Sequence, residues 1–244
     1  MPRLLTRRER YRRIKVSGFT SERRPTSNRY AVRLPLGMSV RLESESAPLH
    51  LLVDSTGLKL CGAGEWLREK HGTKVRRSWR KLHLGLDAGT GQIVAALLTT
   101  RDVDDGSQVG ALLDRIEEPL ASFTGDGAYD QEGVTASIAS RHPEAAIIVP
   151  PRSIAVPSDT AQTAPTQRDH HLRAITEHGR MAWQAASGYT ARARAETAMA
   201  RFKQVIGDGL RSHTAERRRT EVEVAVHVLN RMLDLGRPNS VRIA

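Results

Sequence analysis

Cysteine, aromatic residues and long apolar runs are all scarce in this sequence. Cys61 is the only cysteine among the 244 residues, which excludes a disulfide within the chain and suits a reducing compartment. Aromatic residues make up 4% of the chain, so we expect a core of aliphatic side chains and alanine. No apolar run approaches the roughly 18 residues of a membrane-spanning helix, and the N-terminus lacks the apolar core of a secretory signal. These features predict a cytoplasmic protein without a membrane partner.

Several motifs of well-known chemistry are also missing. The sequence contains no G-x-S-x-G, H-E-x-x-H or G-x-x-x-x-G-K-[ST] pattern, which argues against the corresponding hydrolases, zinc proteases and P-loop proteins. A single cysteine leaves no zinc-finger spacing, and His170 and His171 are adjacent, too close to form a pair of helix-face ligands.

Acidic residues are outnumbered, since 27 Asp and Glu stand against 38 Arg and Lys and give a net charge of +11. Such a basic chain favours an acidic partner, and nucleic acid is the usual one. Residues 1–46 hold twelve Arg and Lys against four Asp and Glu, a net of +8, without sustained periodicity. We interpret them as a mostly irregular basic segment with one short helix over 5–15. Their composition also suits an organellar transit peptide or a start that is not native.

Residues 47–244 have the pattern of one α/β domain with a mixed sheet flanked by helices. The run 49–53 predicts a strand that ends at Asp54, with a turn at 55–57, and residues 78–100 predict a hairpin with its turn at 87–91. Further strands are expected at 120–126 and 145–151, and helices at 109–120, 130–141, 168–178, 191–206 and 217–235.

Local composition assigns structural roles to several positions in this domain. We expect Asp104 or Asp105 to cap the helix 109–120 and Asp130 to cap the helix 130–141. We expect Asp87 to form part of the hairpin turn. The Pro-, Thr- and Ser-rich stretch 152–168 is expected to be a linker or surface insertion.

Four side chains in the helical stretch near residue 196 recur at helical spacing. Tyr189, Arg192, Glu196 and Lys203 stand at offsets of three, seven and fourteen residues, which places them within about 60° of one another on one helix face. Such a stripe would hold a divalent metal through Glu196 and phosphates through Arg192 and Lys203. The alternative is an ordinary i,i+4 surface ion pair of Arg192 and Glu196.

Asp54 and Asp126 each end an apolar run, and the carboxyl ends of neighbouring strands gather at one edge of an open sheet. With Glu196 on a helix that crosses the same edge, they would form a cluster of three carboxylates. Three carboxylates this close would repel one another, so the arrangement is expected mainly around divalent cations. Two Mg²⁺ ions that catalyse phosphodiester chemistry are an example. Taken alone, each aspartate is better explained as a turn former.

A dense basic patch spans residues 66–81 and includes two tryptophans. The patch would neutralise DNA phosphates through Lys74, Arg76, Arg77, Arg80 and Lys81, and an aromatic ring would stack on an unpaired base. The alternative is a solvated loop with one tryptophan packed into the core.

Together these residues resemble the DDE transposases of bacterial insertion sequences, in the group with the motif Tyr-x2-Arg-x3-Glu-x6-Lys. The motif is matched in full by Tyr189, Arg192, Glu196 and Lys203. The sequence segments around Asp54 (LHLLVDSTGLKL) and Asp126 (GDGAYD) are also similar to those of the family. The resemblance covers residues 48–244. It implies an RNase H-like fold in which two Mg²⁺ ions, which Mn²⁺ can replace, are held by Asp54, Asp126 and Glu196.

The same resemblance implies the reaction and the partners. Tyr189, Arg192 and Lys203 would bind the terminal nucleotides of the element, which is cleaved at its ends before the freed 3′-hydroxyl attacks target DNA. The partners would be double-stranded DNA, at the element ends and at the target, and a second copy of the chain in a homodimer on DNA at the bacterial nucleoid. Only 53 residues precede Asp54, fewer than in most relatives, which suggests a truncated or frame-shifted N-terminus. Two competing hypotheses are a DNA-binding remnant without activity and a repair or junction nuclease on the same fold.

Overall fold

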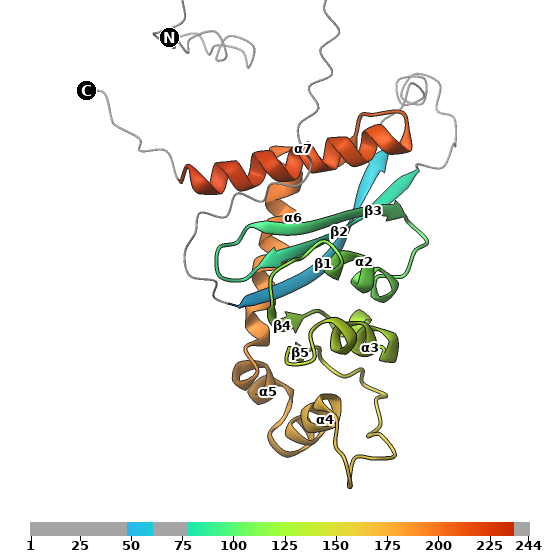
Figure 1. The fold of residues 1–244 in the computed structure, drawn as a ribbon, viewed down its shortest axis with the longest axis vertical. Coiled ribbons are helices and arrows are strands. Elements are labelled where there is room, and N and C mark those ends of the chain that lie inside the picture. The colour runs from blue at the N-terminus through green and yellow to red at the C-terminus, as the bar shows by residue number, and fades with distance from the viewer. Residues whose placement is uncertain (1–47, 61–77, 237–244) are drawn as a thin grey trace, which may run out of the picture. The chain divides into compact units, whose positions relative to one another are not determined.

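In the described part of the chain, a mixed β-sheet of six strands lies between layers of helices (Figure 1). The computed structural model describes residues 48–60 and 78–236. The strands are β1 Leu49–Leu60, β2 Trp79–Asp87, β3 Ile93–Thr100, β4 Leu120–Thr124, β5 Ala146–Ile148 and β6 Gly209–Leu210. They lie in the order β3-β2-β1-β4-β5, and β6 also pairs with β1. β1, β2 and β3 are antiparallel neighbours, whereas β4 and β6 run parallel to β1. The predicted α/β fold, a mixed sheet flanked by helices, is confirmed.

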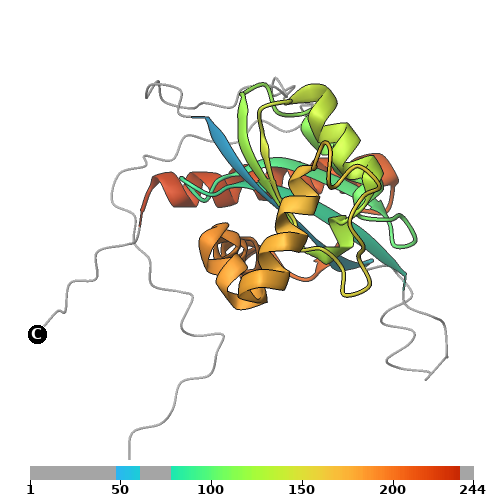
Figure 2. The ribbon, with the colours of Figure 1, turned by 90° about the horizontal axis from the view of Figure 1, so that it is seen from below.

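Helices cover both faces of this sheet. They are the 3₁₀ turns η2 Gly106–Gln108, η3 Gly127–Tyr129 and η4 Tyr189–Arg192, and the α-helices α2 Val109–Leu113, α3 Glu132–Arg141, α4 Gln167–His178, α5 Arg180–Ala186, α6 Ala193–Val205 and α7 Ala215–Asp234. α7 crosses one end of the sheet, and α4 and α5 lie towards the other end (Figures 1 and 2). Among the described residues, no helix has the length and apolar character that crossing a membrane requires.

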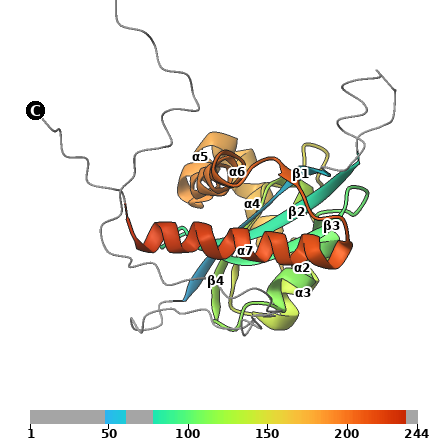
Figure 3. The same cartoon turned by 90° about the horizontal axis from the view of Figure 1, so that it is seen from above.

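The alternation of side chains along β1 divides the core into two clusters. Leu51 and Val53 pack with α2 and α3 on one face of the sheet, and Leu52 and Leu58 pack with α6 and α7 on the other. Figure 3 shows α6 and α3 on opposite sides of the strands. Burial of each such leucine contributes roughly 1.5–3 kcal/mol, so both helical layers are fixed to the strand that carries Asp54.

The predicted turn after Asp54 is wrong, because β1 continues through Ser55, Thr56 and Gly57 to Leu60. Ser55, Thr56 and Gly57 each pair with β2, in a register of nine residues that outweighs the local preference of Ser-Thr-Gly for a turn. Gly57 has a packing role, since a Cβ atom there would lie 3.2 Å from the Trp79 ring. Asp54 therefore stands in the middle of a strand and not at its end.

The predicted hairpin is confirmed, and Asp87 organises its turn. Its carboxylate accepts hydrogen bonds from the backbone N–H groups of Gly89 and Thr90, at 3.0 and 3.2 Å, and from the Thr90 hydroxyl at 2.6 Å. These bonds satisfy the donors of the turn, so the structural role expected for Asp87 fits its surroundings.

Two predictions about helices need correction. The first is the end of the helix expected over 109–120, since α2 ends at Leu113; of its two candidate caps, Asp104 accepts from the Ser107 N–H, as expected, whereas Asp105 makes no capping bond and pairs with Lys81. Asp130 does not cap α3, whose N-cap residue is Gln131. Asp105 and Asp130 each bind a basic side chain from elsewhere in the fold, Lys81 and Arg168 respectively. A charged partner competes well with a neutral backbone donor.

The stretch after β5 is irregular over 149–166, much as expected for 152–168, and is followed by two helices where only one was predicted. α4 ends at His178, and Gly179 lies between α4 and α5. The φ of Gly179 is +82°, which suits glycine. We missed α5 because Gly179 reads as the end of a helix and the seven residues beyond it are too few for a periodic pattern. Residues 1–46 lie outside the described part of the chain, so the expected boundary near residue 47 stays a prediction.

Candidate active site

The register of the parallel pair β1 and β4 brings Asp54 and Asp126 together. The last paired residues are Leu52 of β1 and Thr124 of β4. Asp54 follows Leu52 by two residues, and Asp126 follows Thr124 by two residues. Asp54 shares the face of Leu52, which packs against α6. The prediction that the two aspartates lie side by side thus agrees with the geometry, although Asp54 is not at the end of its strand.

Asp126 is held by the tight turn that follows β4. Its backbone is extended, at φ −81° and ψ −178°, and its Oδ1 accepts the N–H of Ala128 at 2.8 Å, which caps η3. Gly125 precedes it because the Tyr129 ring packs there; a Cβ at Gly125 would lie 2.7 Å from that ring. One oxygen of Asp126 is therefore used by its own turn, and Oδ2 is directed to the neighbouring elements.

Glu196 lies in the first turn of α6, which is anchored to the sheet. Ala195, Met199 and Phe202 of this helix pack in the core with β1 and β2. The Glu196 side chain points away from that core and is 60% exposed. It is the most accessible of the three carboxylates.

Arg192 joins all three carboxylates. Its Nη1 lies 2.6 Å from Glu196 Oε1, and its Nη2 lies 3.4 Å from Asp54 Oδ2 and 3.5 Å from Asp126 Oδ2. The Arg192 side chain is 19% exposed, and its Nε is buried with no hydrogen-bond partner among the described residues. The pair of Arg192 and Glu196 is therefore part of a four-residue cluster and not an isolated surface pair.

Arg192 and Tyr189 do not belong to the α-helix that carries Glu196, which corrects the prediction of a single helical stripe. They lie in η4, and α6 begins at Ala193. Gly188, with φ +73°, separates η4 from α5, and the 3₁₀ geometry of η4 has about three residues per turn, so the α-helical spacing of the sequence does not hold from Tyr189 to Arg192. The tighter turn nevertheless directs Arg192 towards Glu196.

The electrostatics of the cluster follow from burial and from its charges. Burial raises the pKa of Asp54; the Ser55 N–H and Arg192 oppose that rise, while Asp126 and Glu196 add to it. Burial lowers the pKa of Arg192, but the carboxylates outweigh burial and the net pKa is raised. The guanidinium thus stays charged and balances part of the negative charge.

The donors fit a divalent metal by their chemistry, because three carboxylates from different elements converge on one point and hard cations prefer such oxygens. Within 48–60 and 78–236, however, no three acidic, His or Cys residues are already spaced as a metal site. The guanidinium of Arg192 lies where the carboxylates meet. A metal would therefore have to compete with Arg192 for the same oxygens.

Tyr189 is supported by two aromatic residues that we missed in the sequence. Its ring lies 5.5 Å from that of Trp183, whose Nε1 donates to His171 Nδ1 at 2.9 Å; His171 Nε2 then donates to the Ile147 carbonyl at 2.8 Å. Burial raises the pKa of Tyr189. The only hint in the sequence is Trp183 itself, one of three tryptophans in the chain.

Lys203 is not brought into the carboxylate cluster. It is exposed on α6, seven residues beyond Glu196, which is about 10 Å along the helix axis. Within the described residues, Lys203 contributes to lowering the pKa of Asp208, although the main cause of that shift is Lys59. Lys203 remains available to a ligand that extends along α6.

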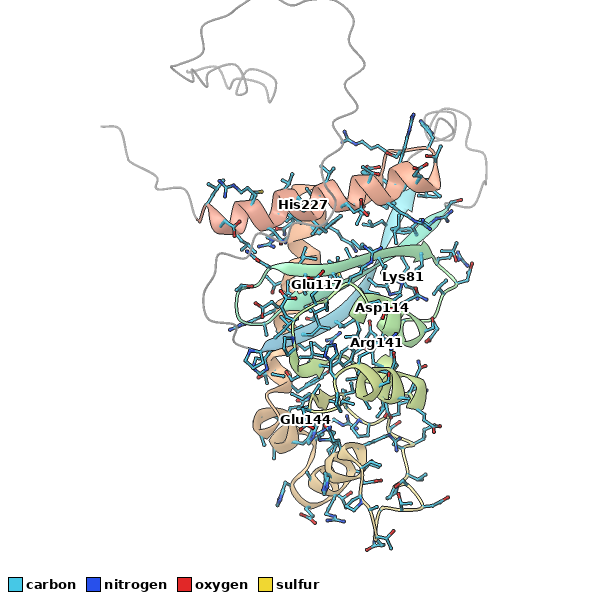
Figure 4. The ribbon with its side chains drawn as sticks, viewed as in Figure 1. Lys81, Asp114, Glu117, Arg141, Glu144 and His227 are labelled. Carbon is cyan, nitrogen blue, oxygen red and sulfur yellow. The ribbon has the colours of Figure 1, made fainter. Side chains whose placement is uncertain are left out.

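The basic patch is only partly described. Lys74, Arg76 and Arg77 lie outside the described residues. Arg80 donates to its neighbour's carbonyl, and Lys81 donates to the Val103 carbonyl at 2.7 Å and lies 3.2 Å from Asp105 (Figure 4). Lys81 alternates with Leu82, which packs against the α6 side of the sheet, so it faces the side away from Asp54.

Comparison with known proteins gives two findings. Residues 45–233 match the family described as "Transposase DDE domain". The chain is also similar, with 10% sequence identity and a TM-score of 0.41, to a chain in the cryo-EM structure of the piggyBac transposase synaptic complex with hairpin DNA. That match covers 75% of the present chain and 46% of the other, so the chain spans about half the length of that relative.

Proposed function

This chain belongs to the transposase DDE domain family, and from that membership we propose that it catalyses the transposition of DNA. The observation that carries the proposal is the convergence of Asp54, Asp126 and Glu196 on the single guanidinium of Arg192. Three carboxylates from a strand, a turn and a helix have no packing reason to meet. A site for hard cations gives them one.

The reaction that we propose is metal-dependent cleavage at the ends of an insertion sequence, followed by attack of the freed 3′-hydroxyl on target DNA. Asp54, Asp126 and Glu196 would hold two Mg²⁺ ions, which Mn²⁺ can replace. Bound there, the ions would activate the attacking oxygen and stabilise the leaving one. The chain itself supplies three carboxylates held at one place by three different elements.

Arg192, Tyr189 and Lys203 would bind the DNA end. Arg192 is well suited because a guanidinium pairs with phosphate as it does with carboxylate, so it would exchange its present partners for the backbone of the DNA. Tyr189 lies beside it on η4, and exposed Lys203 extends the basic surface along α6. Metal binding and DNA binding would thereby be coupled through one side chain.

We propose double-stranded DNA as the partner, at the element ends and at the target, with the chain acting as a homodimer on DNA. Residues 1–46 carry a net charge of +8 and would add phosphate contacts, together with the basic patch at 74–81. A bacterial insertion sequence as the source and an association with the nucleoid belong to the same proposal.

Strand cleavage tests the proposal directly. A supercoiled plasmid that carries the element with its flanks is incubated with the full chain and Mg²⁺ or Mn²⁺, and nicking at the element ends is mapped. Asp54→Asn should abolish nicking. Asp114→Asn is the matched control, since this aspartate is exposed and paired with Arg141 on the other side of the sheet. Equal cleavage by the wild type and Asp54→Asn would refute the assignment.

The competing hypotheses have their own outcomes in the same experiment. DNA binding without nicking in either metal would identify a DNA-binding remnant. Cleavage of branched DNA without joining of 3′ ends to a second duplex would identify a junction nuclease.

A further inference from the structure

A second set of charged residues lies directly behind the turn that carries Asp126. Asp130 follows this turn, Arg152 lies in the irregular segment after β5, and Arg168 is in the first turn of α4. They come from three separate parts of the chain. None of them contacts Arg192 or the other carboxylates through any hydrogen bond within the described residues.

Asp130 is the centre of this set. Its side chain is 5% exposed, and both of its oxygens are used. Oδ1 accepts from Arg168 Nε at 2.7 Å, and Oδ2 accepts from the backbone N–H of Arg152 at 2.9 Å and from Arg168 Nη2 at 3.3 Å. A carboxylate with a bidentate arginine and a backbone donor is held in one orientation.

Arg152 connects this centre to the turn itself. Its Nε donates to the carbonyl of Gly127 at 3.2 Å, and its Nη2 lies 3.5 Å from the carbonyl of Ala128. The amide of Gln131 also donates to the Ala128 carbonyl, at 2.8 Å. The two peptide units after Asp126 are therefore fixed from outside the turn.

The same peptide units position the Asp126 carboxylate. Ala128 donates its N–H to Asp126 Oδ1, so the place of that carboxylate depends on how the turn is held. A local 3₁₀ turn of three residues has little stability of its own, and contacts from other elements must fix it. The chain of contacts runs from α4 through Asp130 and Arg152 to Asp126.

We propose that Asp130, Arg152 and Arg168 are positioning residues that set the Asp126 carboxylate for metal binding. The inference rests on the proposed function, because it assigns Asp126 as a metal ligand. It also gives the irregular segment after β5 and the start of α4 a role in the site, although neither reaches the carboxylates. Outer residues of this kind typically change metal affinity by 10- to 100-fold when they are removed.

The test measures Mn²⁺ binding by the full-length, DNA-free protein. Electron paramagnetic resonance monitors the concentration of the free ion. Arg152→Gln is the main variant because Arg152 is exposed and its loss does not empty the core. We expect its half-saturating Mn²⁺ concentration to rise about tenfold, and that of Arg168→Gln to rise as well. Affinity for DNA, measured without metal, should stay unchanged.

Arg141→Gln is the matched control. Arg141 pairs with Asp114 at 2.8 Å between α3 and α2, and it donates to backbone and side-chain groups of its own helix, so it makes the same kind of contacts away from the turn (Figure 4). A Mn²⁺ curve for Arg152→Gln that coincides with the wild type would overturn the proposal. So would an equal shift in Arg141→Gln, since it would show only a general loss of stability.

Asp126→Asn separates this inference from the proposed function. If Asp126→Asn weakens Mn²⁺ binding and Arg152→Gln does not, the positioning role fails and the metal site stands. If Asp126→Asn leaves Mn²⁺ binding intact, the metal assignment fails and the positioning role fails with it.

Discussion

Arg192 Nη2 lies 3.4 Å from Asp54 Oδ2, a contact between residues 138 positions apart in the sequence. The same guanidinium reaches Asp126 and Glu196, so it holds the place at which a bound cation would meet these oxygens. The contact would make Arg192 a competitor of the proposed metal ions in the absence of DNA. It also means that the site is partly neutralised before any ligand arrives.

Arg192→Gln should therefore strengthen Mn²⁺ binding by the DNA-free protein, although it removes a DNA contact. We expect the half-saturating Mn²⁺ concentration to fall about tenfold, which corresponds to about 1.4 kcal/mol. Cleavage of element ends should fall at the same time. Arg194→Gln is the control, because Arg194 donates to the Ala88 carbonyl and not to the carboxylates. Unchanged or weaker Mn²⁺ binding in Arg192→Gln would exclude the competition.

Asp130→Asn should destabilise the protein in a pH-dependent way. Burial raises the pKa of Asp130, but Arg168 and the Arg152 N–H outweigh burial and lower the net pKa. Because the folded-state pKa lies below the unfolded value near 4, this stabilisation is present above that value and is lost as the pH falls through the folded pKa. We expect a loss of about 1–2 kcal/mol at pH 7, since Arg168 is partly exposed to solvent.

Urea unfolding at pH 7 and at pH 3 measures this difference. The gap between the wild type and Asp130→Asn should narrow at the lower pH. A gap of the same size at both values would mean that the ionised carboxylate is not what Arg168 and Arg152 stabilise.

Trp183→Phe should weaken the support of Tyr189 without emptying the core. The substitution keeps an aromatic ring but removes the Nε1–H that donates to His171, and leaves Nδ1 of that histidine without a partner. We expect a loss of about 1 kcal/mol in the free energy of unfolding. Nitrogen NMR of His171 provides the readout: since the indole N–H can only donate, Nδ1 must be unprotonated in the wild type. A proton on Nδ1 of the wild-type ring would contradict the geometry.

Lys203→Ala should weaken binding to cleaved element ends more than binding to random duplex DNA. The exposed ammonium lies on the same helix as Glu196, so it would contact phosphates next to the cleaved position. Fluorescence anisotropy with both DNAs, at one fixed salt concentration, gives the ratio of affinities. Arg101→Ala, at an exposed residue that pairs with Asp102, serves as the reference. An equal loss on both DNAs would reduce Lys203 to a general phosphate contact.

The sequence predicts β1 to β5, since apolar runs and turn residues report them locally, but it predicts neither the two-residue strand β6 nor the position of Asp54 within β1. The hairpin around Asp87 is an example, because its turn bonds are all within four residues. The adjacency of Asp54 and Asp126 follows from parallel pairing, which a general rule for open sheets anticipates. The end of β1 was predicted wrongly because its last residues are stabilised by β2 and β6 and not by their own composition.

Contacts between distant residues set the rest of the site. Helical spacing placed Arg192 and Glu196 on one helix face, but only the fold shows that Arg192 also reaches Asp54 and Asp126. Asp130 looked like a helix cap, because nothing near it in the sequence reveals Arg168, 38 residues away. Trp183 and His171 lie in the segment between β5 and η4, where neither periodicity nor a motif suggested a role.

The continuation of β1 beyond Asp54 has a consequence for how the site would adapt during two successive reactions. Asp54 and its sequence neighbours Val53 and Ser55 all pair with β2. Asp126 depends on a turn that Arg152 holds from outside, and Glu196 is exposed at the start of a helix. The three carboxylates therefore form a graded set, from immobile to adjustable. Any change of coordination between the proposed steps of hydrolysis and strand transfer would have to come from the helix and the turn, with the strand as the fixed point of reference.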